Sequence, residues 1–375
     1  MFSENGNEQW LAKWPARMLS GGRSFRSGIK AASNETLAPE DDPGFFARRS
    51  PAKVVAQMNS LSASSCCVIL PVKESAEVLA ECLASLAPAL IGGSRAIIVD
   101  DGSDFPLEDD PDLSDFLADE RFVFLRHETS RGPGAARDTG IAWARRHGAE
   151  LAILLDCDCL VSPDFIREHL ALNERHPEAP CCGGSIRGRG RGLWAALDGA
   201  MSWFTSMSET PEGPVRPPYH IPTTNMSLKL SLFRRSDIFD HHLRTGEDVV
   251  LIQRLRQREQ AIIFSPAPMI YHRDRETLRA FLRHQYRWGL HTYVVRRGVD
   301  RLDWGSRLGF AAMFLALSPF YVLHTTALNL HPLLRRSWLY LGLAPALALV
   351  YAIKSIAVLD GTLAPRKALF HDPAH

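Results

Sequence analysis

The stretch LLDCDCLVSPDF (residues 154–165) decides how the sequence around it is interpreted. It completes the apolar run AELAILLDCD (149–158), which ends in two aspartates, Asp156 and Asp158, separated by one cysteine. A run of this length and composition predicts a buried strand, and side chains two apart on a strand point the same way. We therefore expect Asp156 and Asp158 to reach a common point while Cys157 turns into the core.

Two carboxylates that converge with no basic residue nearby in the sequence should repel each other, and a bound cation would remove that repulsion. Oxygen ligands alone suit Mg²⁺ or Mn²⁺, which usually also take phosphate oxygens of a substrate. The alternative is a pair of solvated acids at a turn before Pro163. The pattern alone leaves both interpretations open.

Strands and helices alternate from Ser65 onwards. Short β-branched or apolar runs predict strands at 66–72, 95–103, 121–128 and 149–158, and helical periodicity predicts helices at 75–90 and 132–148. Such alternation predicts an α/β fold with a mainly parallel sheet flanked by helices. Ligands of such sheets bind beyond the carboxyl ends of the strands, where the sequence places acidic residues. We expect these acids to line one cleft: Asp100, Asp101, Asp156 and Asp158.

Composition excludes several other classes of protein. The chain has 43 basic and 42 acidic residues, so net charge gives no argument for nucleic-acid binding. All seven cysteines lie between Cys66 and Cys182, without the spacing of a disulfide framework or of a zinc site. Reduced thiols acting as small apolar residues fit this pattern better.

Six segments in a fixed order carry a resemblance to a known family: VILPVKESAEVLAECLASL, IIVDDGSDF, SRGPGAARDTGI, LLDCDCLVSPDF, TTNMSLKLSLF and TGEDVVLIQRL. The series resembles the family-2 glycosyltransferases of the membrane-associated bacterial type. The resemblance implies a GT-A fold, a Rossmann-type sheet, and inverting transfer of a sugar from a nucleotide donor. It covers residues 65–300, with the nucleotide-binding half at 65–160 and the acceptor half at 161–300.

The resemblance implies a nucleoside site at the ends of the first two strands. In the family these positions contact the nucleoside. By position, Pro71, Val72 and Glu74 would contact the base, and Asp100 and Asp101 would contact uracil or the ribose. This chain has Lys73-Glu74-Ser75 where the family more often has Tyr-Asn-Glu. An ordinary acid at a helix N-terminus is the alternative for Glu74.

The RGPGAARDTG segment matches the glycine-rich stretch of the family, and Gly134 and Arg137 are implied to contact the nucleotide. Glycines before a helix N-terminus let backbone N–H groups approach an anion closely. Asp138 stands where the family usually has Asn. Helix capping is the alternative role of the glycines.

The family's acidic motif implies that Asp156 and Asp158 bind a metal that holds the donor diphosphate, with Asp156 also at the nucleotide. The metal, Mg²⁺ or Mn²⁺, would act as a Lewis acid on the leaving nucleoside diphosphate. His272 in MIYHRD is the expected third ligand or phosphate contact. A surface histidine near a helix start is the alternative.

The family's acidic pair at a helix start implies that Asp248 is the general base, with Glu247 orienting the acceptor. Inversion needs one base to take the proton of the acceptor hydroxyl. The alternative is an ordinary acidic first turn of a helix.

FLRHQYRWGLHTY (281–293) resembles the QxxRW motif of membrane-bound polysaccharide synthases, one residue short. Arg287 and Trp288 would contact the diphosphate and stack on the acceptor sugar. Asn225, in TTNMSLKL, is placed with them at the acceptor and diphosphate. An aromatic and basic helix at a membrane interface is the alternative.

Two apolar stretches, 308–330 and 338–353, predict a helical hairpin within residues 301–375. Arginines before the first stretch, among them Arg296, Arg297 and Arg307, favour a hairpin in the inner cell membrane with the catalytic domain facing the cytoplasm. Arg335 and Arg336 between the stretches disagree with that rule. A hairpin that enters one leaflet without crossing and a buried soluble subdomain therefore stay open.

Residues 1–64 mix Gly, Ser, Pro and charge with little periodicity, which predicts a mobile segment without a secretory signal. Trp10, Trp14 and Met18 alternate with basic residues, which fits either a membrane-surface segment or a disordered tail.

The sequence thus predicts a metal-dependent, hexosyltransferase-like enzyme of polysaccharide or glycolipid synthesis. Its expected partners are a UDP- or GDP-sugar donor, a glycan or lipid-linked acceptor and a membrane, and no nucleic acid. The alternatives are a non-catalytic relative in a membrane assembly and a nucleotidyltransferase on a related fold. The latter would need a GxGxR-type loop after the first strand, where the chain has LPVKESAEV.

Overall fold

The computed structural model describes residues 61–369 except 218, 235–236, 298–302 and 337. The segment 1–60, with the predicted membrane-surface or disordered tail, lies outside the described residues. The strands all belong to one mixed sheet: β1 (Cys66–Val72), β2 (Arg95–Asp100), β3 (Phe122–Arg126), β4 (Leu151–Leu155), β5 (Cys159–Val161), β6 (Cys181–Gly188), β7 (Gly213–Pro214), β8 (Asn225–Lys229) and β9 (Ile262–His272).

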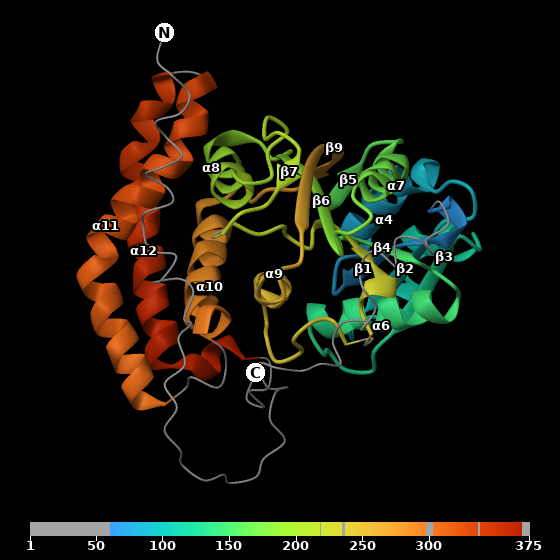
Figure 1. The fold of residues 1–375 in the computed structure, drawn as a ribbon, viewed down its shortest axis with the longest axis horizontal. Helices are drawn as coiled ribbons and strands as arrows, with labels where there is room; N and C mark the ends of the chain where they lie inside the picture. Colours follow the sequence, from blue (N-terminus) through green and yellow to red (C-terminus); the bar gives the residue numbers. More distant parts are fainter. Residues whose placement is uncertain (1–60, 218, 235–236, 298–302, 337, 370–375) are drawn as a thin grey trace.

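Helices cover this sheet and form a separate layer beside it (Figure 1). Their bounds are α4 (Ala76–Leu86), α5 (Ser114–Leu117), α6 (Pro133–Arg146), α7 (Phe165–Arg175), α8 (Gly192–Trp203), α9 (Glu247–Gln257), α10 (Leu278–Arg297), α11 (Trp304–Arg336), the 3₁₀ helix η7 (Trp338–Leu343) and α12 (Ala344–Leu363).

The predicted α/β fold is confirmed, with β1 to β4 as one parallel part and β6 with β9 as a second. The strand order is β3-β2-β1-β4-β8-β6-β9-β5, with β7 on β9. β1 pairs in parallel with β2 and β4, and β2 with β3. β8 is antiparallel to both of its neighbours, β4 and β6. The carboxyl ends of β1, β2 and β4 therefore lie at the same edge of the sheet.

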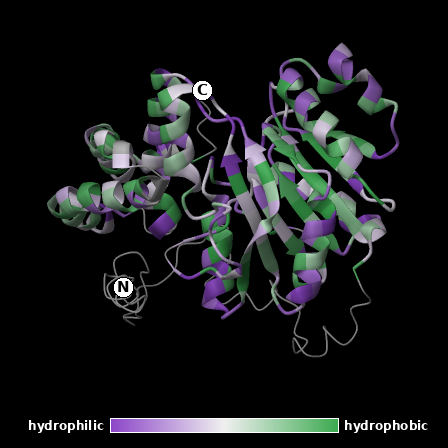
Figure 2. Ribbon diagram, turned by 90° about the horizontal axis from the view of Figure 1, so that it is seen from above, coloured by the Kyte–Doolittle hydropathy of each residue, from purple (hydrophilic) through white to green (hydrophobic). Residues whose placement is uncertain are grey.

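Alternating side chains of the strands build two cores. Val68 and Leu70 of β1 pack under α4 and α7, whereas Cys67 and Ile69 pack under α6 and α9. All seven cysteines are free, and six of them are buried. This agrees with their interpretation as small apolar residues. Figure 2 shows hydrophobic residues concentrated along the strands and along the helices of the separate layer.

One local expectation is wrong. The strand predicted at 149–158 ends at Leu155, and Asp156, Cys157 and Asp158 form a turn between β4 and β5. The alternation of side chains along a strand therefore does not apply to these aspartates. Cys157 is only partly buried, at the edge of the core under α4.

The predicted C-terminal hairpin is confirmed as α11 and α12, which pack against each other. The stretches Trp304–His331 and Tyr340–Leu363 are long and apolar enough to cross a membrane. Glycines bring α12 close to α10. A Cβ added to Gly289 would lie 2.6 Å from the Cβ of Ala357, and one added to Gly361 would meet the carbonyl of Leu290. The hairpin is thus joined tightly to the helix that follows the sheet.

This close approach predicts opposite effects for one substitution at two helical glycines. Gly361→Ala should lower the free energy of unfolding by about 1–3 kcal/mol, because the added methyl overpacks the contact with Leu290. Gly309→Ala meets nothing within 4 Å and should be neutral or stabilising by up to about 1 kcal/mol through helix propensity. Thermal unfolding of both variants in detergent measures the difference, and equal stability would contradict this packing.

Candidate active site

A single buried arginine joins two acidic motifs that are far apart in the sequence. Arg137, from the middle of α6, is 3% exposed. Its Nη1 donates to Glu247 Oε1 at 2.5 Å, and its Nη2 donates to Asp156 Oδ1 at 2.7 Å. The structure therefore brings together three residues that the sequence placed in the site. It does so by charge pairing, because a buried guanidinium needs carboxylate partners.

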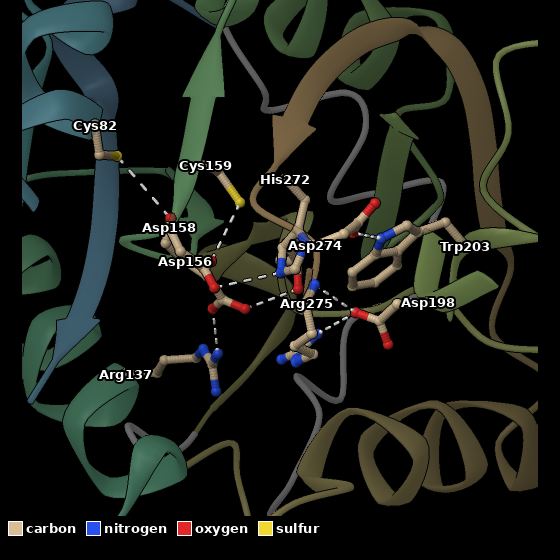
Figure 3. A network of polar contacts seen from close by, with 11 residues as sticks. Cys82, Arg137, Asp156, Asp158, Cys159, Asp198, Trp203, His272, Asp274 and Arg275 are labelled. Carbon is tan, nitrogen blue, oxygen red and sulfur yellow. Dashed lines mark hydrogen bonds and ion pairs between the residues drawn. The ribbon is translucent and has the colours of Figure 1, made fainter. Parts of the chain in front are cut away.

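Asp156 and Asp158 face two different cationic groups (Figure 3). Asp156 contacts Arg137 and accepts from Thr224 Oγ1 at 2.8 Å. Asp158 Oδ2 lies 3.3 Å from His272 Nε2. The repulsion expected from the sequence is thus relieved by two residues, 19 positions before Asp156 and 114 positions after Asp158.

His272 is the centre of a chain of polar contacts at the end of β9. Its Nδ1 lies 3.0 Å from Asp274 Oδ1, which also accepts from Trp203 Nε1 at 3.1 Å. Burial alone would lower the pKa of His272, but Asp158 and Asp274 outweigh it and raise that pKa to about 9. Burial would raise the pKa of Asp158, but His272 outweighs it and lowers that pKa to about 2. The two side chains therefore form a charged pair.

The donors at this edge of the sheet fit a divalent cation in their chemistry. Carboxylate oxygen and imidazole nitrogen are both ligands that Mn²⁺ accepts, and Asp158 and His272 already lie together. Asp156 is turned towards Arg137 instead. Within the described residues, no group of three or more His, Cys, Asp or Glu side chains is arranged to hold an ion.

The acidic pair stands at the first turn of α9, after Gly246. Gly246 has φ +86°, and a Cβ there would lie 2.6 Å from Val295 Cγ2, so the turn into the helix requires glycine. Asp248 Oδ1 accepts from the N–H of Val249 at 2.7 Å, and Oδ2 lies 3.5 Å from His220 Nε2. Burial raises the pKa of Asp248 to about 6. Burial also raises the pKa of Glu247, against the opposing effect of Arg137.

The two acids after β2 are held by internal hydrogen bonds. Asp100 accepts from the N–H of Ser103 at 2.9 Å and pairs with Arg126. Asp101 lies 2.7 Å from His127 Nδ1 and accepts from three further donors. These donors are Ser130 Oγ, the Arg131 N–H and the Gly132 N–H. Asp101 thus fixes the loop that leads into α6.

The end of β1 lies beside these acids. The carbonyl of Val72 accepts from the N–H of Asp101 at 2.8 Å, and Pro71 precedes it in the strand. Glu74 has φ +51°, a conformation in which few non-glycine residues occur. Its Oε1 accepts from the N–H of Asp104 at 2.5 Å. The predicted nucleoside residues of β1 and β2 therefore form one cluster.

Four predicted site residues make their contacts elsewhere. Gly134, in the first turn of α6, packs against Phe239 and Asp240. Asn225 is fully buried, and its amide bonds to the carbonyls of Ser185 and Pro268. Arg287 is exposed on α10. Trp288 lies against His284, with Lys354 Nζ of α12 at 5.1 Å from its ring.

Comparison with known proteins places one segment of the chain in a family. Residues 67–238 match the sequence model described as Glycosyl transferase family 2. This segment belongs to that family. The chain is 27% identical over 231 residues to the pre-mycofactocin glycosyltransferase of Mycobacterium tuberculosis. This alignment covers 59% of this chain and 45% of that protein. The chain is 30% identical over 142 residues to an N-acetylglucosaminyltransferase of Azorhizobium caulinodans, covering 37% of this chain and 33% of that protein. The chain thus spans less than half the length of these relatives.

Solved structures of similar fold are more distant in sequence. S. aureus TarS 1-349 in complex with UDP-GlcNAc is 16% identical, with a TM-score of 0.44 over 82% of this chain and 93% of that chain. GalNAc-T7 with UDP, GalNAc and Mn²⁺ is 17% identical, with a TM-score of 0.43 over 59% of this chain and 45% of that chain.

Sequence reasoning missed several residues that hold the candidate site. Thr224 and Asp274 each stood one or two positions from a residue that was singled out, in TTNM and YHRD. His220 belongs to the loop before β8, and only the fold brings it to Asp248. Arg126 ends β3 and His127 follows it, and only the order β3-β2 places them beside Asp100 and Asp101. The sequence signal that could have found Arg126 and His127 is their polar character at the end of the predicted strand 121–128.

The Arg137 bridge predicts strong energetic coupling between Arg137 and Glu247. Arg137→Met should cost roughly 3–5 kcal/mol of stability, because it leaves buried carboxylates without their cation. Adding Glu247→Gln should recover part of that loss, since one buried charge disappears with its partner. Urea unfolding of the four proteins of this double-mutant cycle measures the coupling.

The matched control is the same cycle on the exposed pair Arg167 and Asp164, where coupling should be close to zero. Additive effects of Arg137→Met and Glu247→Gln would contradict the bridge.

Proposed function

We propose that this protein transfers a sugar from a nucleotide diphosphate donor to an acceptor hydroxyl with inversion at the anomeric carbon. The observation that carries the proposal is the Arg137 bridge. It joins the aspartate after β4, on the donor side, to the first turn of α9, where Asp248 has a pKa raised to about 6. A base near neutrality beside a donor site is what inverting transfer requires. Membership of glycosyl transferase family 2 supports the same conclusion.

Asp248 acts as the general base. It takes the proton of the acceptor hydroxyl while that oxygen forms its bond to the anomeric carbon and the bond from that carbon to the diphosphate oxygen breaks. The carboxylate must be ionised to do this, so its raised pKa keeps it strong enough as a base and still ionised at neutral pH. Glu247 stays paired with Arg137 and orients the acceptor side.

The donor lies across the ends of β1, β2 and β4. Pro71, Val72 and Glu74, with Asp100 and Asp101, form the nucleoside end, and Gly134 and Arg137 lie at the start and middle of α6. Within the cluster, Asp100 and Asp101 shape the loops that contact the base or ribose. UDP or GDP is the expected carrier, and the name of one relative, an N-acetylglucosaminyltransferase, supports a hexosyl-type group.

With Asp156, Asp158 and His272 would hold Mg²⁺ or Mn²⁺ on the diphosphate, and His272 would give up its proton when it binds the ion. The ion would supply Lewis-acid stabilisation of the leaving group. Arg137 adds a fixed positive charge beside Asp156, and Thr224 keeps that carboxylate in place.

The acceptor is a glycan or a lipid-linked glycan presented at a membrane. The two long apolar helices suggest membrane association, and the sequence favours the inner cell membrane with the catalytic part, residues 65–300, facing the cytoplasm. Arg287 and Trp288 on α10 then stand between the hairpin and the site, at the acceptor side. Asn225 is fully buried and does not contact the acceptor in this proposal.

Replacing the base should separate turnover from donor binding. Asp248→Asn should lower kcat by about 10²–10⁴-fold and leave the Kd of the donor near normal. In the unchanged protein, kcat should rise with pH through about 6 and then level off, because only the ionised carboxylate accepts the proton. The variant should lose that limb. Steady-state kinetics from pH 5 to 8 and donor titration measure both; a parallel loss of donor affinity would move Asp248 into the nucleotide site.

Removing the metal or its ligand should abolish transfer. Chelation with EDTA should stop activity, and added Mn²⁺ or Mg²⁺ should restore it. Asp158→Ala should weaken Mn²⁺ binding followed by electron paramagnetic resonance. Asp164→Ala, an exposed aspartate six residues away that pairs with Arg167, is the matched control and should bind Mn²⁺ normally. Full transfer after chelation would sink the role of the metal.

A further inference from the structure

The hairpin presents one exposed apolar surface, here called the outer face. On α11 it consists of Leu308, Leu315, Phe320 and Leu323, which are 53–67% exposed. Leu349 and Ile356 of α12, seven residues apart, continue it at 63% and 62% exposed. None of the apolar window within Trp304–His331 is buried by the rest of the described chain. Exposed apolar area of this extent indicates a binding surface.

The other side of α12 is covered by α10 along most of its length. Lys354 Nζ lies 3.4 Å from Gln285 Oε1, and Tyr286 donates to Asp360 Oδ2 at 2.7 Å. Further along, Leu290 meets Gly361. Residue numbers rise together in these contacts, so α10 and α12 run side by side in the same direction. Figure 1 shows the order α11, α12, α10 across this layer.

The free face of α10 is strongly basic. Arg279, Arg283 and Arg287 follow one another at intervals of four residues, so they lie on one side of the helix. All three are exposed, and within the described part of the chain none has an ion pair. Gln285, between Arg283 and Arg287, is level with Lys354, near the middle of the apolar stretch Tyr340–Leu363.

A membrane-crossing α12 would therefore carry these arginines into the bilayer centre, where charged side chains are costly. It would also carry the catalytic domain there. Trp194 of α8 lies 6.2 Å from Phe281 of α10, measured between ring centroids. Leu197 and Met201 of α8 share a core with Leu347 and Val350 of α12. The middle of α12 is thus fixed to the catalytic domain itself.

We propose that the hairpin does not cross the bilayer: α11 lies along the membrane surface, α12 lies beside it against α10, and the outer face that the two helices share is inserted into one phospholipid leaflet. The inference rests on the membrane association proposed above. Trp304 and Trp338, at the two ends of α11, are 64% and 76% exposed. Tryptophan suits the headgroup level, and a helix parallel to the surface keeps both rings at that depth.

This arrangement sets the distance from the active site to the lipid. β9 ends at His272 and α10 begins at Leu278, so few residues separate the site from the helix that holds α12. An acceptor carried by a lipid would reach the site from the headgroup level of the same leaflet.

The outer face is tested by flotation of the full-length protein with vesicles of phosphatidylethanolamine and phosphatidylglycerol. Leu315→Arg and Leu323→Arg should each lower the vesicle-bound fraction by about ten-fold, since a charge replaces an inserted apolar side chain. Leu117→Arg, the same change on α5 at a residue 37% exposed, is the matched control and should float like the unchanged protein. Flotation of Leu323→Arg at the unchanged level would overturn the proposal.

The second measurement decides between one leaflet and crossing. Trp338→Cys, made in otherwise unchanged protein, is treated in intact spheroplasts with a membrane-impermeant maleimide. The unchanged protein gives the background of the native thiols. Trp338→Cys should react only after lysis, as should Arg167→Cys on the catalytic domain, where Arg167 is 63% exposed.

Reaction of Trp338→Cys in intact spheroplasts, with Arg167→Cys protected, would show a crossing hairpin and overturn the proposal. Failure of the unchanged protein to float would overturn it together with membrane association. Sugar transfer is assayed separately with a soluble acceptor. Failure of the proposed sugar transfer is therefore distinguishable from failure of the proposed insertion into one leaflet.

Discussion

A buried guanidinium held between two carboxylates is the constraint on which the rest of the site depends. Arg137 reaches Asp156 after β4 and Glu247 at the start of α9, so a shift of α6, β4 or α9 would leave a buried charge without its partner. The position of α6 is fixed in turn by Gly140. A Cβ at that position would lie 2.5 Å from Ile69 Cγ2, so only glycine lets the helix lie this close to β1.

The surroundings of two carboxylates in the site shift their pKa values in opposite directions. Asp158 lies beside His272 and stays ionised, with its pKa lowered to about 2, whereas burial raises the pKa of Asp248 to about 6. Two carboxylates of similar intrinsic acidity thus serve different tasks, one as a permanent charge and one as a proton acceptor. The separation requires a cation beside one aspartate and burial of the other, and the fold supplies both.

Much of the fold could be predicted from the sequence, because its signals are local. The periodicity of 66–72 and 132–148 gave β1 and α6 within a few residues, and two apolar stretches gave the hairpin. The contacts within the candidate site were harder to predict from the sequence. The run before Asp156 shows no break at Leu155, so the turn was read as strand. The cations that pair with Asp156 and Asp158 come from other elements, and no spacing in the sequence encodes those contacts. Asp101 carries a strong motif, yet its bonds to His127 and the next loop depend on the order of β3 and β2.

The helix α10 lies between the candidate site and the C-terminal hairpin. Its sequence, with Gln285, Trp288 and arginines at every fourth position, was equally compatible with an acceptor site and with a membrane-interface helix. In the fold the two sides of α10 differ. Gln285, Tyr286 and Gly289 face α12, whereas the arginines lie on the exposed side. A helix that is close-packed on one side and basic on the other can hold an apolar hairpin only where the basic side stays in water. The position of the hairpin relative to lipid therefore follows from the amphipathic pattern of α10 as much as from the apolar length of α11 and α12.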